Sequence, residues 1–452
     1  MIQKSFKIYL KNYLKERDEK IVISDNNGTC NNEQFKEKIS LYKKILEKKW
    51  KKKNSTKGLA ILLERNIDYL ALIFACWLSG GYYVPLSLDS IIKNRKYQIK
   101  SSNVDILAIS KNGKVFFKSL KIKDKNKIIK KNKGKIAYIV FTSGSTGQKK
   151  GVIISYKNIL SYMKGVHQIF KNKFISKSVL INGELTFDIS VADLVFAILF
   201  KTEISITSDS KNLLSLFSMI EKRKIESIYV VPSTLKKIIE FTKQNKDLKI
   251  NSLKQINCGG EVLEHQDVKQ IFKLMKNVSI YNFYGPTEFT VNCFFHKVEK
   301  NLKYKKNIPI GKTIPGIKYI TKNIDNNNKE LLLNGSQLMI GYLNSKSPNV
   351  KINNKIFYPT KDIVSIDQKK NVYFEGRIES YVKIQGYRVN LNRIENIFKQ
   401  NLGLNTKAIV NHNLIYIFVE STGKPKKFFS QTKKILENYL ERYERPKKNY
   451  DH

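Results

Sequence analysis

The sequence predicts an α/β fold with more than one domain, and three observations support this prediction. Through most of the chain, helical patterns alternate with short runs of β-branched and aromatic residues, which is typical of layered sheets with largely parallel strands. From about Ile308 the pattern changes to short strands and polar turns, and a further compact segment follows Arg377. We therefore expect a large N-terminal domain over 1–376, with layered sheets and helices plus a β-rich subdomain, and a small C-terminal α+β domain over 377–452.

The individual elements can be placed in order along the chain. The clearest strand candidates are rich in Val, Ile, Tyr and Phe, and they lie at 58–63, 82–86, 136–141, 178–182 and 227–231. A helix is expected over 191–200. The charge-free stretch 69–88 is long enough to suggest a membrane span, but Gly80, Gly81 and Pro85 favour a buried helix that ends at a turn before a strand. The last segment of the chain is expected to have a βαβ-like order.

The composition is that of a folded and strongly basic protein. The 452 residues include 83 Lys and Arg against 38 Asp and Glu, a net charge of +45, and 41% are hydrophobic, which excludes wholesale disorder. A nucleic-acid-binding protein concentrates its basic residues in one element, whereas these lysines are spread over nearly every segment. We attribute the charge mainly to a codon bias that also enriches Asn, Ile, Tyr and Phe, with an anionic partner as the alternative, and we expect no nucleic-acid or membrane partner.

The cysteines and the N-terminus indicate a cytoplasmic protein. The four cysteines form no CxxC pair and have no histidine at metal-ligand spacing, which argues against a disulfide framework or a zinc site and fits a reducing compartment. The N-terminus carries a charge every few residues and has no apolar stretch, so no signal peptide is expected.

The segment 141–152, Phe-Thr-Ser-Gly-Ser-Thr-Gly-Gln-Lys-Lys-Gly-Val, has the composition of a phosphate-binding loop that follows an apolar strand. Glycines let backbone N–H groups converge on phosphate oxygens, hydroxyl groups add donors, and a lysine neutralises charge. The spacing is not that of a Walker A loop, and a flexible Gly/Ser turn is the alternative. The residues expected to contact phosphate are Thr142, Ser143, Gly144, Ser145, Thr146, Gly147 and Lys150.

With this loop the sequence resembles the adenylate-forming superfamily, and within it the amino-acid-activating branch of nonribosomal peptide adenylation domains and D-alanine–carrier protein ligases. The loop of that family reads TSGSTGxPKG, and 142–151 match it except that Lys149 stands where proline is usual. Further motifs follow in the order of the family, namely NCGGEVL at 257–263, YNFYGPTE at 281–288, YPTKD at 358–362 and FEGR at 374–377.

The resemblance implies a binding site for ATP and Mg²⁺. It implies that Tyr284 stacks on adenine, that Asp362 accepts both ribose hydroxyls with Arg377 close by, and that Glu288 holds Mg²⁺, a hard cation that prefers oxygen ligands. Pro359 and Lys361 depart from the family's ribose motif. The other residues carried over as ATP-binding are Gly260, Glu261, Asn282, Phe283, Gly285, Pro286, Thr287, Phe374, Glu375 and Gly376. The residues carried over as catalytic are Thr142, Lys150, Thr287, Glu288 and Lys383.

An amino-acid pocket is implied by LTFDISVAD at 185–193, which resembles the FDxS element of amino-acid activators. A buried carboxylate is costly unless a cation pairs with it, and the ammonium group of a substrate would do so. Asp188 is therefore the expected anchor for the amino group, with an ordinary helix N-cap as the alternative. By the same resemblance the side-chain pocket would be lined by Ile189, Ala192, Val230, Asn257, Gly259, Phe283, Val291 and Asn292. These residues are mostly small or apolar, which indicates a small uncharged amino acid, although any of them could be an ordinary core residue.

The region 187–292 is most similar to D-alanine–carrier protein ligases. Those ligases tend to have cysteine directly before the Gly-Glu pair, whereas here Gly259 holds that position and Cys258 lies one residue earlier. Alanine of either hand, glycine and other small amino acids therefore remain open as substrates.

The C-terminal segment resembles the mobile domain of the family. Residues 376–395 match GRxDxQVKIRGxRIELGEIE, with Glu379 as the hinge acid and with Lys383 and Gly386 on the strand that faces the active site during thioester formation. Residues 440–448, Leu-Glu-Arg-Tyr-Glu-Arg-Pro-Lys-Lys, resemble LPxYMIPxK. The NGK lysine of the family would fall just beyond 452, so we expect a naturally short domain, a fragment of a longer chain, or substitution by a nearby lysine such as Lys447 or Lys448.

The resemblance implies a ligase that adenylates a small amino acid such as alanine and passes it to the phosphopantetheine thiol of an acyl or peptidyl carrier protein. Acidic carrier proteins would be attracted by a basic surface. An acyl- or aryl-CoA synthetase and a catalytically impaired ATP-binding remnant are the two alternatives. The first would have no use for Asp188, and the second would explain the departures from the motifs.

Overall fold

The computed structural model describes residues 2–15, 21–51, 55–121, 126–142, 149–174, 176–245, 250–301, 307–324, 328–378, 381–384, 386–402, 406–411, 413–420 and 425–446. Within these residues, no helix is both long enough and apolar enough to cross a membrane. The stretch 69–88 instead contains the end of a buried helix and a short strand, as the sequence predicts.

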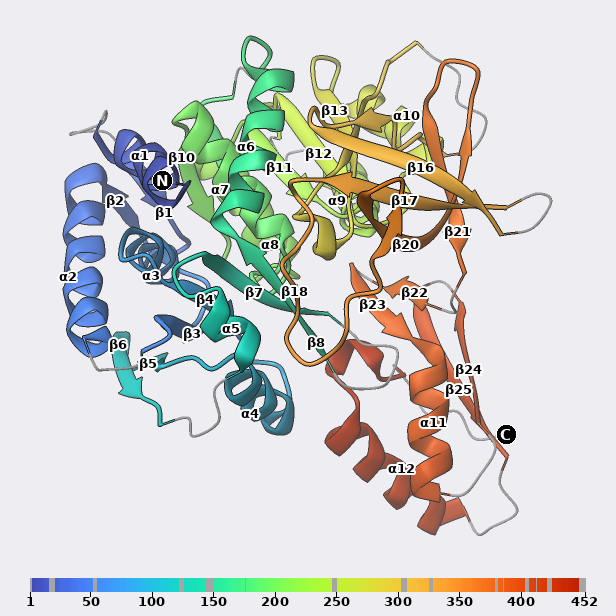
Figure 1. Ribbon diagram of the computed structural model, residues 1–452. Helices are drawn as coiled ribbons and strands as arrows, with labels where there is room; N and C mark the ends of the chain where they lie inside the picture. Colours follow the sequence, from blue (N-terminus) through green and yellow to red (C-terminus); the bar gives the residue numbers. More distant parts are fainter. Residues whose placement is uncertain are drawn as a thin grey trace.

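Two large sheets form the main body of the described structure, and their central strands are parallel (Figure 1). The nine-stranded sheet has the order β15-β14-β13-β12-β11-β9-β10-β1-β2. Its strands are β1 (Ile21–Ser24), β2 (Thr29–Asn31), β9 (Ser178–Ile181), β10 (Glu203–Ile206), β11 (Ser227–Val230), β12 (Gln255–Gly259), β13 (Ser279–Tyr284), β14 (Phe294–Lys297) and β15 (Lys312–Thr313). The seven-stranded sheet has the order β18-β8-β7-β4-β3-β5-β6. Its strands are β3 (Gly58–Leu62), β4 (Tyr82–Pro85), β5 (Ile106–Lys111), β6 (Lys114–Ser119), β7 (Ile136–Thr142), β8 (Lys150–Ser155) and β18 (Gly341–Tyr342).

Helices pack on both faces of each sheet. The largest hydrophobic cluster joins the two sheets through a shared layer of helices, which are α1 (Ile2–Lys15), α2 (Asn32–Trp50), α3 (Ile67–Leu78), α6 (Tyr156–Phe170) and α7 (Ile189–Phe200). A second cluster covers the outer face of the nine-stranded sheet with α8 (Leu213–Arg223), α9 (Pro232–Gln244) and α10 (His265–Leu274). A third covers the outer face of the seven-stranded sheet with α4 (Ile92–Ser101) and α5 (Lys127–Lys131).

The sequences of these helices account for their layers. α3 and α7 are apolar on nearly every side, and almost all of their residues are buried, because both lie between two sheets. α9 and α10 carry lysines and other polar residues on one face, and only the opposite face packs on the sheet.

The β-rich region after Ile308 is confirmed as a five-stranded antiparallel sheet within the described residues. It consists of β16 (Ile317–Asn323), β17 (Lys329–Gly335), β19 (Val350–Ile352), β20 (Lys355–Ile366) and β21 (Val372–Arg377). A single-turn 3₁₀ helix, η1 (Thr287–Phe289), follows β13 and leads towards this region.

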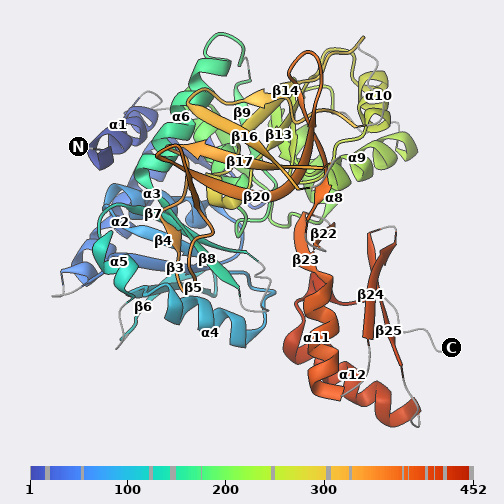
Figure 2. The ribbon, with the colours of Figure 1, turned by 45° about the vertical axis from the view of Figure 1, so that its right-hand side comes forward.

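The C-terminal unit, residues 381–446, has its own hydrophobic cluster (Figure 2). The expected βαβ-like order is wrong. The unit contains two separate antiparallel hairpins, each followed by a helix, because short turns join neighbouring strands and leave no helical crossover between them. Its elements are β22 (Tyr381–Ile384), β23 (Tyr387–Asn390), α11 (Leu391–Leu402), β24 (Thr406–Asn411), β25 (Leu414–Val419), α12 (Pro425–Tyr439) and η2 (Arg442–Glu444).

Candidate active site

The expected phosphate loop connects two paired strands of the seven-stranded sheet. Thr142 ends β7 and lies directly opposite Lys150, which begins β8. Five of the residues predicted to contact phosphate lie outside the described residues: Ser143, Gly144, Ser145, Thr146 and Gly147. The Lys150 ammonium group lies 5.6 Å from the centre of the Tyr342 ring, on the neighbouring strand β18.

Tyr342 joins the end of this loop to Glu288. Its hydroxyl donates a 2.7 Å hydrogen bond to Oε1 of Glu288, whose side chain is buried. Among the described residues, the other oxygen, Oε2, is buried and accepts no hydrogen bond. A buried carboxylate oxygen with an open lone pair is a suitable ligand for a hard cation, so the site fits Mg²⁺ held by Glu288 and by oxygens of a bound phosphate.

A second group of polar residues surrounds Asp362 on β20. The Arg377 guanidinium lies 2.9 Å from Oδ1 of Asp362, and the Tyr284 hydroxyl donates to Oδ2. Arg377 also donates to the Thr360 carbonyl. The structure thus brings together three residues that the motifs place far apart in sequence, and it holds the expected ribose-binding carboxylate in a fixed orientation.

Some residues carried over from these motifs have structural roles. The exposed Glu375 accepts a hydrogen bond from Ser365 on the neighbouring strand, so its side chain belongs to the outer surface of the sheet. Asn282 is buried and donates to the Ile308 and Pro309 carbonyls, which ties β13 to the β-rich region. These hydrogen bonds give both side chains a role within the sheets.

Asp188 lies at the start of α7, but its side chain does not cap the helix. It is 7% exposed, and its Oδ2 accepts a 3.3 Å hydrogen bond from the Val291 amide. Burial raises the pKa of Asp188 to about 6, opposed by the Val291 amide and reinforced by the negative charge of Glu288. Thr287 also lowers the pKa of this carboxylate, so the ATP motif lies next to the expected amino-acid pocket.

The backbone at Val291 is unusual. Its φ of 67° is in the left-handed region, which a β-branched residue adopts only when the surrounding structure holds it there. Thr290 before it has φ of 57° and donates its hydroxyl to the Gln337 carbonyl. This strained turn directs the Val291 amide at Asp188. Both residues are among those that the sequence predicts to contact the substrate.

The bottom of the expected side-chain pocket is filled by Tyr229. A Cβ atom at Gly259 would lie 2.3 Å from the Tyr229 hydroxyl, so any larger residue would collide with it. That hydroxyl donates to Asn292, and Asn292 in turn donates to Tyr162. These hydrogen bonds hold the hydroxyl of the buried Tyr229 ring against Gly259.

Val230 on β11 was expected to line this pocket, and its neighbour Tyr229 is the residue whose side chain lies against Gly259. Val230 packs with Cys258 in the cluster on the outer face of the nine-stranded sheet. Tyr229 packs in the central cluster and contacts Phe283 at 5.8 Å between ring centres. Because side chains alternate along a strand, only one of these two neighbours can face Gly259.

The C-terminal unit contacts the main body next to this pocket. The Gly386 amide donates a 2.6 Å hydrogen bond to Oε1 of Glu261, and Oε2 accepts one from the Ser233 amide. Gly386 has φ of 84°, and a Cβ there would lie 3.2 Å from Val231. A glycine is therefore required both by the backbone conformation and by the close approach.

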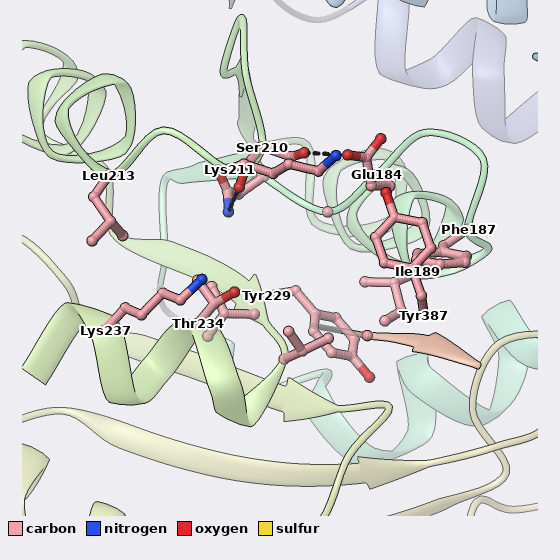
Figure 3. Close-up of a pocket in the computed structure, with 15 residues that line it drawn as sticks. Glu184, Phe187, Ile189, Ser210, Lys211, Leu213, Tyr229, Thr234, Lys237 and Tyr387 are labelled. Carbon is pink, nitrogen blue, oxygen red and sulfur yellow. Dashed lines mark hydrogen bonds between the residues drawn. The ribbon is translucent and has the colours of Figure 1, made fainter. Parts of the chain in front are cut away.

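A narrow cavity of about 60 Å³ lies at this contact (Figure 3). Phe187 and Ile189 line it from the main body, and Gly386 and Tyr387 line it from the C-terminal unit. The rings of Phe187 and Tyr387 meet edge to face at 4.9 Å. Lys383 lies on β22 with an exposed side chain, while the expected hinge acid Glu379 and the lysines 447 and 448 lie outside the described residues.

The family of AMP-binding enzymes matches residues 13–343, well over half of the chain. The chain belongs to this family. AMP-binding enzymes of this kind are adenylate-forming ligases, which agrees with the order of motifs in the sequence.

Curated relatives of this AMP-binding enzyme include proteins of peptide biosynthesis. Dapdiamide synthesis protein DdaD from Enterobacter agglomerans is 25% identical over 448 residues, covering 94% of this chain and 74% of that protein. The chain also matches bacitracin, plipastatin and linear gramicidin synthases, but it spans 15% or less of their length.

Solved structures confirm the fold of the AMP-binding enzyme. The adenylation domain AlmE of Vibrio cholerae, in complex with glycyl-adenosine-5'-phosphate, has a TM-score of 0.79 at 19% identity, and the match covers 98% of this chain and 93% of that one. NpsA-ThdA, an artificially fused adenylation–PCP di-domain from Klebsiella oxytoca, has a TM-score of 0.79 at 16% identity, with coverage of 98% and 92%. At these identities the similarity concerns the fold alone.

Sequence reasoning missed the residues that support the expected site residues from other strands. Tyr342 orients Glu288, and Tyr229 with Tyr162 fixes Asn292. These tyrosines belong to none of the motifs. Their only signal in the sequence was the presence of apolar neighbours, which indicates burial but not a role in the site. Their roles depend on which strands become neighbours.

Proposed function

We propose that this AMP-binding enzyme activates a small amino acid with ATP and passes the aminoacyl group to the phosphopantetheine thiol of a carrier protein. In the first step a carboxylate oxygen of the amino acid attacks the α-phosphorus of ATP, and pyrophosphate leaves. In the second step the thiolate attacks the carbonyl carbon of the aminoacyl adenylate, AMP leaves, and a thioester remains. The proposal divides the chain into a core domain over 1–376 and a mobile domain over 377–452.

The observation that carries the proposal is the state of Asp188. Its carboxylate is buried, and its raised pKa shows that the neighbouring groups do not fully compensate its charge. A substrate ammonium group would supply the missing positive charge, whereas a fatty or aryl acid would leave the carboxylate unpaired. Asp188 therefore favours an amino acid over the substrates of an acyl- or aryl-CoA synthetase.

The size of the substrate follows from the pocket beside Asp188. Tyr229 occupies the space next to Gly259, and its hydroxyl is fixed by Asn292. We propose glycine or alanine as substrates, because a larger side chain would displace this ring. The fold neighbour AlmE was solved with a glycyl adenylate, which supports a small amino acid.

The nucleotide would be held by two groups of residues. Asp362, held by Arg377 and Tyr284, would accept the ribose hydroxyls, and Thr142 and Lys150 would contact the phosphates. Bound Mg²⁺ would neutralise phosphate charge, with Glu288 as its protein ligand. Glu288 is oriented for this by Tyr342, and Thr287 lies between the metal ligand and Asp188.

The carrier protein is supported by the contact between the C-terminal unit and the main body. Gly386 and Tyr387 reach the cavity beside Phe187 and Ile189, directly next to Asp188, and we propose this as the route of the thiol. The fold neighbour NpsA-ThdA combines an adenylation domain with a PCP domain, which is consistent with such a partner.

The test is ATP–pyrophosphate exchange with matched acids that differ only in the amino group. Glycine is compared with acetate, either hand of alanine with propionate, and valine serves as a larger amino acid. We expect the amino acids to support exchange at least roughly a hundredfold better than their deaminated partners, since an unpaired buried charge costs ~3–5 kcal/mol. Equal exchange rates with the amino acids and with the deaminated acids would contradict the proposal. ATP binding with no exchange in the presence of all the amino acids tested would contradict it as well.

A further inference from the structure

Glu441 of the C-terminal unit is buried against the main body and is held there by several groups. The Lys149 ammonium group lies 2.9 Å from Oε1 of Glu441, and the side chains are 18% and 3% exposed. Ser90 and Asn94 donate hydrogen bonds of 2.8 and 2.6 Å to the same oxygen. All three partners belong to the main body, so the interaction exists only in the observed orientation of the C-terminal unit.

The carboxylate also completes one end of α4. Ile91 is the N-cap residue of this helix and provides no side-chain cap, and its amide lies 3.4 Å from Oε2 of Glu441. A negative charge at a helix N-terminus is stabilised by the free N–H groups and by the helix dipole. The C-terminal unit thus supplies the cap that the sequence of α4 lacks.

The C-terminal unit presents Glu441 in a fixed position. The Glu441 amide donates to Glu444, and Glu444 forms a 2.6 Å ion pair with Arg393 of α11. Burial would raise the pKa of Glu441, but Lys149, Asn94 and Ser90 outweigh it and hold the pKa below its ordinary value. The carboxylate is therefore ionised and compensated, unlike Asp188.

Lys149 and Glu441 both stand at positions where the family motifs quoted above have proline. Lys149 replaces the proline of TSGSTGxPKG, and Glu441 replaces the first proline of LPxYMIPxK. Proline cannot form an ion pair, and a single buried charge at either position would be costly without its partner. The two departures from the family pattern account for each other.

We propose that Lys149 and Glu441 form an interdomain latch that holds the C-terminal unit in the orientation used for thioester formation. Glu441 acts as a positioning residue, because it touches neither the expected substrate nor the nucleotide. Lys149 belongs to the expected phosphate loop, so the latch joins that loop to the C-terminal unit. The orientation itself is independent of catalysis, whereas its use in thioester formation rests on the proposed function.

A nearby ion pair offers a matched control. Arg442, adjacent to Glu441, lies 3.1 Å from Asp89 of the main body, and both side chains are largely exposed, at 69% and 52%. An exposed pair contributes little to stability because water and salt screen it. Arg442→Gln removes an interdomain charge at almost the same place without removing a buried interaction.

The test measures the distance between the two units with spin labels. The four native cysteines are buried, so labels can be attached to Lys222→Cys on α8 and Lys399→Cys on α11, which are exposed. We expect one dominant distance in the full chain. Glu441→Gln and Lys149→Pro should each lower the ratio of this population to other distances by roughly tenfold to a hundredfold, as for a lost charge-assisted hydrogen bond.

Two further variants separate a latch from a general structural effect. Lys149→Arg keeps the positive charge opposite Glu441 and should keep most of the dominant distance, whereas Arg442→Gln should leave it unchanged. An unchanged distance in Glu441→Gln, or an equal shift in Arg442→Gln, would overturn the latch.

The catalytic consequence is measured as two separate half-reactions. Glu441→Gln should slow transfer from a supplied aminoacyl adenylate to a carrier thiol roughly tenfold, and pyrophosphate exchange should stay close to that of the parent chain. A loss of both half-reactions in this variant would contradict the positioning role. If the parent chain shows neither half-reaction, the proposed function fails, and the distance measurement alone decides on the latch.

Discussion

Asp188 and Glu441 are buried to a similar extent, with 7% and 2% of their surface exposed, but their pKa values move in opposite directions. Burial dominates at Asp188, where one backbone amide and one hydroxyl face the carboxylate and a second carboxylate lies close by. At Glu441 burial acts in the same direction, but a lysine and two hydrogen-bond donors outweigh it. The difference therefore lies in the neighbours and not in the depth of burial.

The comparison separates a binding site from a structural contact. A carboxylate whose charge is compensated by groups of its own protein gains little free energy from binding a further cation. A carboxylate that remains under-compensated keeps a free energy that a cationic ligand can recover on binding. This distinction is the physical basis for assigning the amino group of the substrate to Asp188 and the orientation of the C-terminal unit to Glu441.

The largest expected effect is the loss of amino-acid activation in Asp188→Asn. The substituted amide cannot compensate an ammonium group, so amino-acid-dependent pyrophosphate exchange should fall roughly a hundredfold or more, while ATP affinity stays nearly unchanged. Asp193→Asn is the matched control, because Asp193 is a buried carboxylate on the same helix and burial raises its pKa far above the usual range. Similar losses in both variants would show that the effect comes from helix α7 and not from recognition of the amino group.

The second prediction concerns the stability of the same variant. Asp188→Asn should lower activity but should stabilise the folded protein. The pKa of Asp188 is about 6 in the folded protein, above the model-peptide value of 3.8, so its ionisation destabilises the folded state by up to about 3 kcal/mol above pH 6. At a pH below about 4 the group is protonated in both states and this cost disappears. Asp188→Asn should therefore raise the free energy of unfolding in urea at pH 7.5 and have little effect at pH 4. A less stable variant at pH 7.5 would mean that Asp188 is already compensated.

The smallest effect is expected for Glu441→Gln, and it should be destabilising. The substitution removes a charge-assisted hydrogen bond and should lower the stability of the docked C-terminal unit by about 1–3 kcal/mol. Because the pKa of Glu441 is lowered on folding, this contribution is present above the unfolded pKa of about 4 and is lost as the pH falls through the folded value. Protease cleavage of the C-terminal unit at pH 7.5 measures it, with Arg442→Gln as the control. If the parent chain and Glu441→Gln are cleaved at equal rates, Glu441 does not stabilise the docked unit, and its proposed difference from Asp188 is wrong.

The motifs could be located from sequence because each is a short contiguous segment whose residue types favour a particular loop, turn or helix start. The Gly-rich loop between β7 and β8, the turn after β13 and the FDxS element before α7 all lie where the residue patterns predict. The alternation of strands and helices also fixed the α/β class, since helices that are apolar on every side must lie between layers. The burial of Asp188 could also be expected from sequence, because this acidic residue lies beside Phe187 within an apolar stretch.

The sequence alone determined the fold class and the order of the ATP motifs, and it led to the hypothesis that Asp188 pairs with a cation. Only the tertiary structure decided that Tyr229 and not Val230 faces Gly259, because a shift of one residue along a strand reverses the side. It alone decided that Tyr342 orients Glu288 and that Lys149 meets Glu441. Local propensity carries no information about which distant strands and domains become neighbours, and the compensation of a buried charge depends on those neighbours.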